Sequence, residues 1–148
     1  MRKLLLIVTL ITSNLLFSQE AEDQPFAIIE VVPTYPGCSG DNQSLKECMS
    51  SKISTLVGQN FNVKKTSKGI PAGKHRIFVS FRINKKGKID NIKTRSEYPK
   101  FEKEAKRVIG LIPKMKPGYQ KGKAVGVLYS LPITFQIDED KKVKNKKL

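Results

Sequence analysis

VGVLYSLPITFQI, residues 125–137, is the stretch with the strongest secondary-structure signal in this 148-residue chain. Apolar side chains occupy every second position, which is the period of a strand with one face on a core. They are Val125, Val127, Tyr129, Leu131, Ile133, Phe135 and Ile137. The stretch is long for a strand, and Pro132 has no N–H to donate to a neighbour. We therefore expect at least one side of this strand to be an unpaired edge at Pro132.

A second strand signal lies upstream and belongs to a hairpin. Apolar residues at positions 77, 79, 81 and 83 alternate with a mostly polar set. In the polar run 84–88, Gly87 can supply the left-handed residue of a three-to-five-residue turn. The returning strand carries Ile89 and Ile92, a spacing that breaks the period of two. This predicts a β-bulge at Asp90–Asn91.

Two amphipathic helices flank these strands. The first is capped by Asp41 or Ser44 and ends near Gly58 or Asn60. Its apolar face is formed by Leu45, Met49, Ile53, Leu56 and Val57. The second starts at Pro99, and its stripe consists of Phe101, Ala105, Val108, Ile109 and Ile112. The order helix, strand, strand, helix, strand predicts an α+β fold. We expect a two-layer sandwich in which both helices cover one face of a small three-stranded antiparallel sheet.

Residues 1–18 have the layout of a secretory signal peptide. Arg2 and Lys3 precede an almost wholly apolar run, residues 4–17, and the chain turns polar at Ser18. This run is shorter than the roughly 20 residues that a membrane span needs, although an uncleaved anchor is the alternative. Cleavage near Ser18 would leave a soluble periplasmic protein without an inner-membrane anchor.

The remaining chain divides into three parts. Residues 19–32 form an acidic lead-in, in which Phe26–Val32 is a possible extra strand. Residues 33–137 form the domain, with a basic loop at residues 114–123. Residues 138–148 form a charged, lysine-rich tail that we expect to be disordered.

The two cysteines, Cys38 and Cys48, agree with export. In an oxidising compartment they would pair, and closing so short a loop stabilises the fold by about 2–3 kcal/mol. Metal binding is the first alternative, but a metal site needs about four ligands and the single histidine, His75, is distant in sequence. A redox pair is the second, but it is more typically spaced Cys-x-x-Cys. We expect a structural disulfide and no metal.

Charge is spread unevenly along the chain, whose formal net charge is +15. Acids outnumber bases six to two in residues 19–63, whereas bases outnumber acids nineteen to four in residues 64–123. Such a field favours acidic partners, although a solvated lysine surface is equally compatible with it. An exported protein rarely meets nucleic acid, so anionic envelope polymers are the more plausible polyanions.

No catalytic residues are apparent. His75 stands at the start of a strand and is interpreted as solvated. The acids Asp90, Glu97, Glu102 and Glu104 do not form a recognisable paired carboxylate site, and no glycine-rich phosphate loop is present. We therefore expect neither enzymatic activity nor a cofactor.

Several segments together resemble the C-terminal domain family of the TonB energy transducers. They are the hairpin Ile77–Ile92, then Pro113–Gly118, Gly122–Val125 and Pro132–Phe135, with Val32–Gly37 similar to the opening of Bacteroidetes-type members. The order and spacing of these segments cover residues 33–137 and are more specific than any one of them.

The resemblance implies a periplasmic protein-binding module in energy-coupled transmembrane transport. Members contact TonB-dependent outer-membrane receptors, whose extended TonB-box peptide adds as a strand to the edge of the last strand. The resemblance places this edge over Val125, Gly126, Val127, Leu128, Tyr129, Ser130 and Leu131. Gly126 and Ser130 would leave space for guest side chains. The edge could instead pair with Phe26–Val32, or with a second copy in a homodimer.

Some features depart from the family pattern. A full transducer has an uncleaved transmembrane helix and a long Pro-rich span, neither of which is recognisable here, so this chain would not transmit force from the inner membrane. Met115 replaces a frequent aromatic residue, and the cysteine pair is an addition. A basic envelope protein that binds polyanions, or that modulates or assembles other envelope proteins without energy transduction, is therefore the alternative function.

Overall fold

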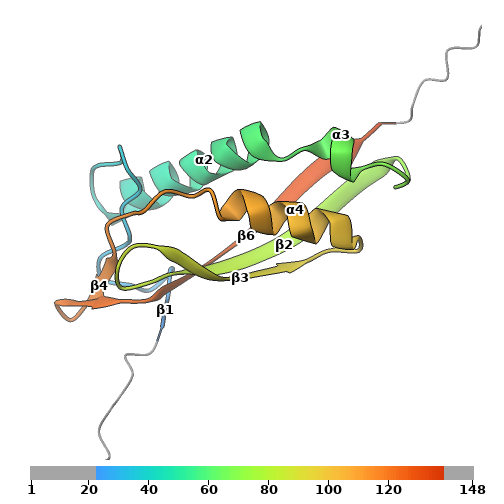
Figure 1. Ribbon diagram of the computed structural model, residues 1–148. Coiled ribbons are helices and arrows are strands. Elements are labelled where there is room, and N and C mark those ends of the chain that lie inside the picture. Colours follow the sequence, from blue (N-terminus) through green and yellow to red (C-terminus); the bar gives the residue numbers. More distant parts are fainter. Residues whose placement is uncertain (1–22, 139–148) are drawn as a thin grey trace, which may run out of the picture.

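The computed structural model describes residues 23–138 (Figure 1), so the predicted signal peptide and residues 139–148 of the tail lie outside the described range. The elements in chain order are β1 (Gln24–Pro25), α2 (Asn42–Asn60), α3 (Val63–Thr66), β2 (Gly73–Ile83), β3 (Ile89–Arg95), α4 (Pro99–Ile109), β4 (Gly118–Gln120), β5 (Lys123–Val125) and β6 (Val127–Ile137). One sheet has the strand order β1-β6-β2-β3, and β4 and β5 form a separate hairpin. None of the helices in this part of the chain combines the length and apolarity needed to cross a bilayer.

Both long helices cover one face of the main sheet (Figure 1). Side chains from α2 and α4 pack with the odd-numbered residues of β2 and β6 in one apolar cluster. Its fully buried members include Met49, Ile53, Ile77, Phe81, Ile83, Phe101, Ala105, Val108 and Ile109. The even-numbered residues point to the other face, where Phe78 and Leu128 remain largely exposed. The α+β two-layer sandwich is therefore confirmed. The main sheet contains the three predicted antiparallel strands and, as a fourth, the short N-terminal strand β1.

The strand registers confirm the predicted hairpin and bulge. All eleven residues of β2 pair with β6 in antiparallel register. Between β2 and β3 the register shifts, because Ser80 lies opposite Lys93 but Arg82 lies opposite Asp90. One extra residue of β3 is thus accommodated, and Asn91 has a left-handed φ of 49°. This places the bulge next to Asp90, as expected.

The β2–β3 turn depends on Gly87 for two separate reasons. Its φ is 75°, in the left-handed region that favours glycine. A Cβ at this position would also overlap the backbone carbonyl of Met115, whose N–H donates a 2.9 Å hydrogen bond to the Gly87 carbonyl. The turn is therefore attached to the loop that follows α4.

The helix boundaries follow local chemistry. The Asp41 side chain accepts a 2.8 Å hydrogen bond from the Ser44 N–H, which caps α2 and holds the pKa of Asp41 below its usual range. The helix ends at Asn60, one of the two residues predicted to stop it. Pro99 occupies the first turn of α4, as its fixed φ and missing N–H favour.

Four expectations differ from the structure. Phe26–Val32 is not a strand; the N-terminal strand is Gln24–Pro25, which pairs in parallel with β6. The stretch from Val63 to Lys74, whose serine, glycine and proline residues predict a loop, begins with a short helix, α3. The basic loop 114–123 contains β4, because Lys121 and Gly122 both have positive φ and close a two-residue turn against β5. The long strand predicted over 125–137 is interrupted at Gly126, so Val125 belongs to β5.

Candidate functional site

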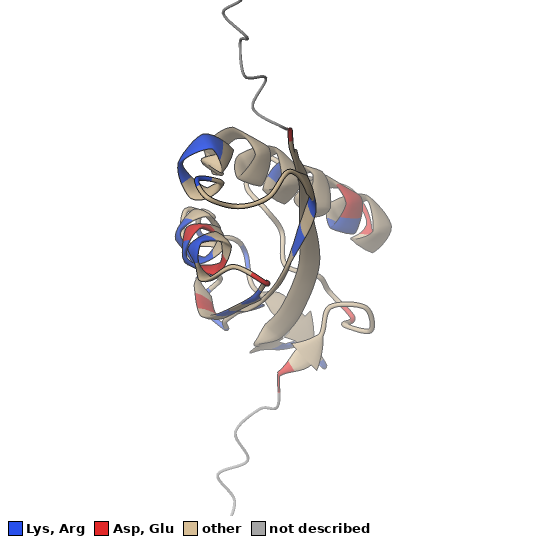
Figure 2. Ribbon diagram, turned by 90° about the vertical axis from the view of Figure 1, so that its right-hand side faces the viewer, with Lys and Arg blue, Asp and Glu red and all other residues tan. Residues whose placement is uncertain are grey.

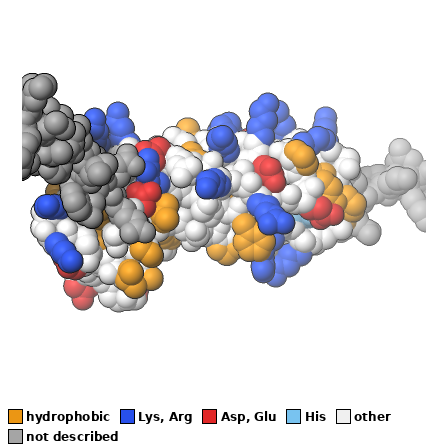
Figure 3. Space-filling model, turned by 90° about the horizontal axis from the view of Figure 1, so that it is seen from below, with side chains coloured by type: hydrophobic (Ala, Val, Ile, Leu, Met, Phe, Trp, Pro, Cys, Tyr) orange, Lys and Arg blue, Asp and Glu red, His pale blue; other side chains and the backbone are white. Residues whose placement is uncertain are grey.

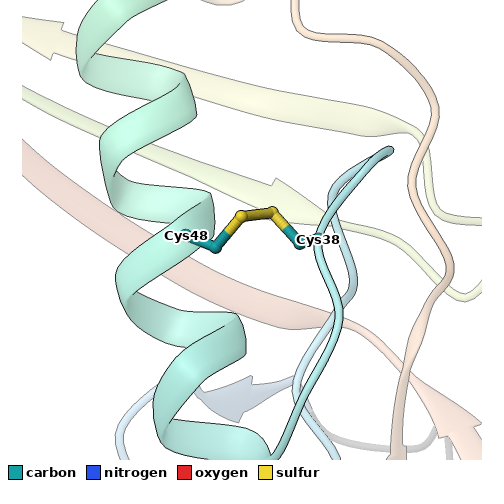
Figure 4. Close-up of a disulfide and its surroundings, with 2 residues drawn as sticks. All are labelled: Cys38 and Cys48. Atoms are coloured by element: carbon teal, nitrogen blue, oxygen red, sulfur yellow. A yellow bond between two sulfur atoms is a disulfide. The ribbon is translucent and has the colours of Figure 1, made fainter.

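The predicted disulfide is present (Figure 4). Cys48 lies on α2 and is bonded to Cys38 in the preceding loop, with their Cα atoms 5.9 Å apart. Cys38 also packs, partly buried, against the main apolar cluster and against a second, smaller one. The second cluster consists of Ile29, Val32, Leu45, Val125 and Val127. The pair therefore ties the loop to the helix, which is a structural role.

The chain's own N-terminus occupies half of the binding edge predicted at residues 125–131. The carbonyl oxygens of Gly126 and Leu128 accept hydrogen bonds of 2.8 and 3.2 Å from the N–H groups of Gln24 and Phe26. Pairing with Phe26–Val32 is the alternative that the sequence leaves open; in the structure the pairing strand lies slightly earlier, at Gln24–Pro25. A guest strand has no free backbone partner at these two residues while β1 is in place.

An ion-pair network holds β1 at this position. Arg82 lies 3.2 Å from Asp23 and 2.7 Å from Asp90. The hydrogen bonds that Arg82 donates to Asp90 and Asp23 raise its own pKa, and the same contact holds the pKa of Asp90 below its usual range. The Asp23 carboxylate fills the space that a Cβ on Gly126 would need. Gly126 therefore makes room for the chain's own acid and not, as predicted, for a guest side chain.

Beyond Leu128, the outer edge of β6 has no backbone partner within residues 23–138. In antiparallel pairing, alternate residues direct both backbone groups toward or away from the partner strand. The Leu128 carbonyl points away from β2, toward β1, so the backbone groups of Ser130, Pro132, Thr134 and Gln136 also point away from β2. The backbone nitrogen of Pro132, which carries no hydrogen, thus lies on the open side of β6. The expectation of an unpaired edge at this proline is confirmed.

An apolar groove runs beside this open edge, on the side of the sheet that the helices cover. It has a volume of about 360 Å³ and lies between the C-terminal part of α2 and β6. Its lining consists of Ser54, Val57, Gly58, Phe61, Val63, Leu131, Pro132, Ile133, Thr134 and Phe135. Because alternate side chains of a strand point to opposite faces, a guest strand on β6 would direct every second side chain into this groove. The sequence did not predict the groove, since α2 and β6 are far apart along the chain.

The opposite edge of the sheet is protected against such pairing. Strand β3 contains the bulge at Asn91 and carries the charged residues Asp90, Lys93 and Arg95. Bulges and charges are the features that natural sheets use to prevent edge-to-edge pairing. Residues 129–137 of β6 carry no charged side chain, so the two edges differ in their capacity to accept a strand.

His75 belongs to an aromatic cluster, whereas the sequence predicted a freely solvated side chain. Its ring centroid lies 5.5 Å from those of Tyr98 and Phe101 and 6.0 Å from that of Phe135. Its Nε2 lies 3.0 Å from the Pro71 carbonyl oxygen. Within residues 23–138, no three His, Cys, Asp or Glu side chains gather into a group that could hold a metal ion.

The comparisons with known proteins concern the segment that carries this edge. Residues 74–137 match the family model described as the Gram-negative bacterial TonB protein C-terminal. No curated protein matches the chain. Among solved structures, the NMR solution structure of the Helicobacter pylori TonB C-terminal domain is 22% identical, covers 71% of this chain and 89% of that chain, and has a TM-score of 0.45. The matched segment runs from β2 to the end of β6. Residues 74–137 of this chain are therefore similar to the TonB protein C-terminal family.

Proposed function

We propose that this chain is a periplasmic TonB-like module that binds TonB-dependent outer-membrane receptors in energy-coupled transport, by accepting a receptor peptide as an additional strand. The observation that carries the proposal is the open outer edge of β6 from Ser130 to Gln136, which lies beside an apolar groove. The match of residues 74–137 to the TonB C-terminal family model supports it. The role is binding, without catalysis.

The geometry favours a segment shifted from the predicted one. The open edge begins at Ser130, where β1 no longer pairs, and extends to Gln136. It overlaps the predicted segment at Ser130 and Leu131. Each main-chain hydrogen bond to a guest contributes about 0.5–1.5 kcal/mol, and the groove selects among side chains. Affinity would thus come from the strand and selectivity from α2.

The test removes one donor from this edge and leaves the rest of the chain unchanged. The variant is Thr134→Pro, because the N–H of Thr134 points away from β2, and Thr134→Val is the matched control that keeps the N–H. Binding of a panel of synthetic TonB-box peptides would be measured by isothermal titration calorimetry. We expect Thr134→Pro to weaken binding about tenfold or more and Thr134→Val to change it less than about threefold. Replacing Val127 by proline would be a poor test, because its N–H points toward β2.

Amide hydrogen exchange of the unaltered protein gives a second readout. The N–H groups of Ser130, Thr134 and Gln136 should exchange rapidly without peptide and slowly with it. Protection of all three in the free monomer, or peptide binding that is indifferent to Thr134→Pro, would disprove the proposal. If two copies pair through β6, sedimentation at increasing concentration will show a dimer that the peptide dissociates.

A further inference from the structure

The sheet face that the helices leave uncovered carries cations around an exposed aromatic ring. We call it the open face, and it is formed by Arg76, Phe78, Ser80, Lys93, Arg95, Ser130 and Pro132. Two cross-strand rows lie at its centre: Arg95, Phe78 and Pro132, and beside them Lys93, Ser80 and Ser130. The Phe78 side chain is 57% exposed. A shallow hollow of about 380 Å³ lies over these two rows.

The positive charges of the open face are not compensated. The Arg76 guanidinium lies 5.9 Å from the centroid of the Phe78 ring. No ion pair within residues 23–138 involves Arg76, Lys93 or Arg95, whereas Arg82 on the same side of β2 is paired with two acids. Figure 2 shows basic residues on the strands as well as on the helices. Figure 3 shows basic side chains next to exposed apolar ones on the side of the molecule below the helices, with a few acidic side chains among them. The charge of this face therefore favours an anionic ligand.

The chemistry of the open face indicates which kind of anion it suits. The negative face of an aromatic ring attracts the positively polarised C–H groups of a sugar ring, and the hydroxyls of Ser80 and Ser130 can bond sugar hydroxyls. An acidic peptide could pair its carboxylates with the same cations, but β2 is paired on both sides and offers such a peptide no main-chain hydrogen bonds. An anionic bilayer would present a broad, flat charged surface, whereas Phe78 and Pro132 border a hollow that a narrow chain can enter. We propose that the open face binds an anionic polysaccharide, independently of strand addition at the edge of β6.

The first test separates this face from general positive charge. Polygalacturonate serves as the anionic polysaccharide and dextran as its neutral counterpart. The double variant Lys93→Gln and Arg95→Gln should weaken polygalacturonate binding about tenfold or more, since it removes both cations of the central rows. Lys85→Gln with Lys86→Gln removes the same charge from the exposed β2–β3 turn and should weaken binding less than about threefold. Equal loss in the two double variants, or equal binding of dextran, would overturn the proposal.

The second test separates a sugar from other anions. Polyglutamate presents carboxylates without sugar rings, and vesicles with anionic lipids present a charged surface. The unaltered protein should prefer polygalacturonate to polyglutamate of equal length by about tenfold, and Phe78→Ala should abolish that preference. Tighter binding to polyglutamate or to the vesicles would refute the assignment. Chemical-shift mapping on the unaltered protein keeps the test valid if a variant unfolds: polygalacturonate must perturb residues 76–80 and 93–95, and perturbation confined to 134–137 would count against it.

Discussion

Replacing both Cys38 and Cys48 by serine is expected to lower the free energy of unfolding by about 3 kcal/mol. The crosslink joins residues with a sequence separation of 10. In the loop-entropy relation, a loop of that length contributes about 2.7 kcal/mol at 25 °C. Cys38 also packs against both apolar clusters, so a serine hydroxyl there adds a small further cost. For a domain of this size the loss corresponds to a decrease in Tm of roughly 10 °C.

The assay is urea unfolding of the double variant followed by circular dichroism, with differential scanning calorimetry for Tm. The unaltered protein treated with a thiol reductant is the control, because it breaks the same crosslink without changing the chain, and should lose a similar amount. Peptide binding at residues 130–136 should be unchanged, since the disulfide attaches α2 to the preceding loop and not to β6. A loss under about 1 kcal/mol, or a large loss in the variant that reduction does not reproduce, would refute the loop-entropy account.

Three other perturbations probe the fold. Gly87→Ala should lower the free energy of unfolding in urea by about 2–5 kcal/mol, because φ is positive there and the new Cβ would overlap the Met115 carbonyl. Gly69→Ala is the control, since Gly69 has a similar φ of 77° but no heavy atom within 4 Å of the new Cβ, and should cost only about 1–2 kcal/mol. Hydrogen bonds from arginines lower the pKa values of Asp90 and Glu104, so the unfolded state binds more protons than the folded state in acid. The free energy of unfolding should therefore be constant above about pH 5 and fall as the pH drops through and below the ordinary carboxylate pKa of about 4. Unfolding measured at a series of pH values will test this. Tyr129→Phe removes a hydroxyl that forms a 2.8 Å hydrogen bond with a serine of α2 and should cost about 1 kcal/mol by thermal unfolding.

The candidate edge could be located from sequence only in part. Pro132 carries the signal, because a residue without an N–H in a long alternating strand must have one open side. That reasoning located the unpaired edge at Pro132, whereas the resemblance placed the binding edge at residues 125–131, part of which pairs with β1. The occupation of Gly126 and Leu128 by Gln24 and Phe26 joins segments about a hundred residues apart, and no local pattern encodes such pairing.

What the sequence determined by itself is local. Backbone and side-chain preferences within a few residues determine the alternation of β2 and β6 and the apolar stripes of α2 and α4. The same local preferences determine the cap at Asp41, the turn at Gly87 and the bulge beside Asp90. Only the tertiary structure decided which backbone groups stay open, because that depends on which distant segments pack together. Three features combine residues that are far apart in the sequence: the parallel pairing of β1, the groove beside α2 and the open face. Each forms only because packing in the folded protein offsets the entropy of closing long loops.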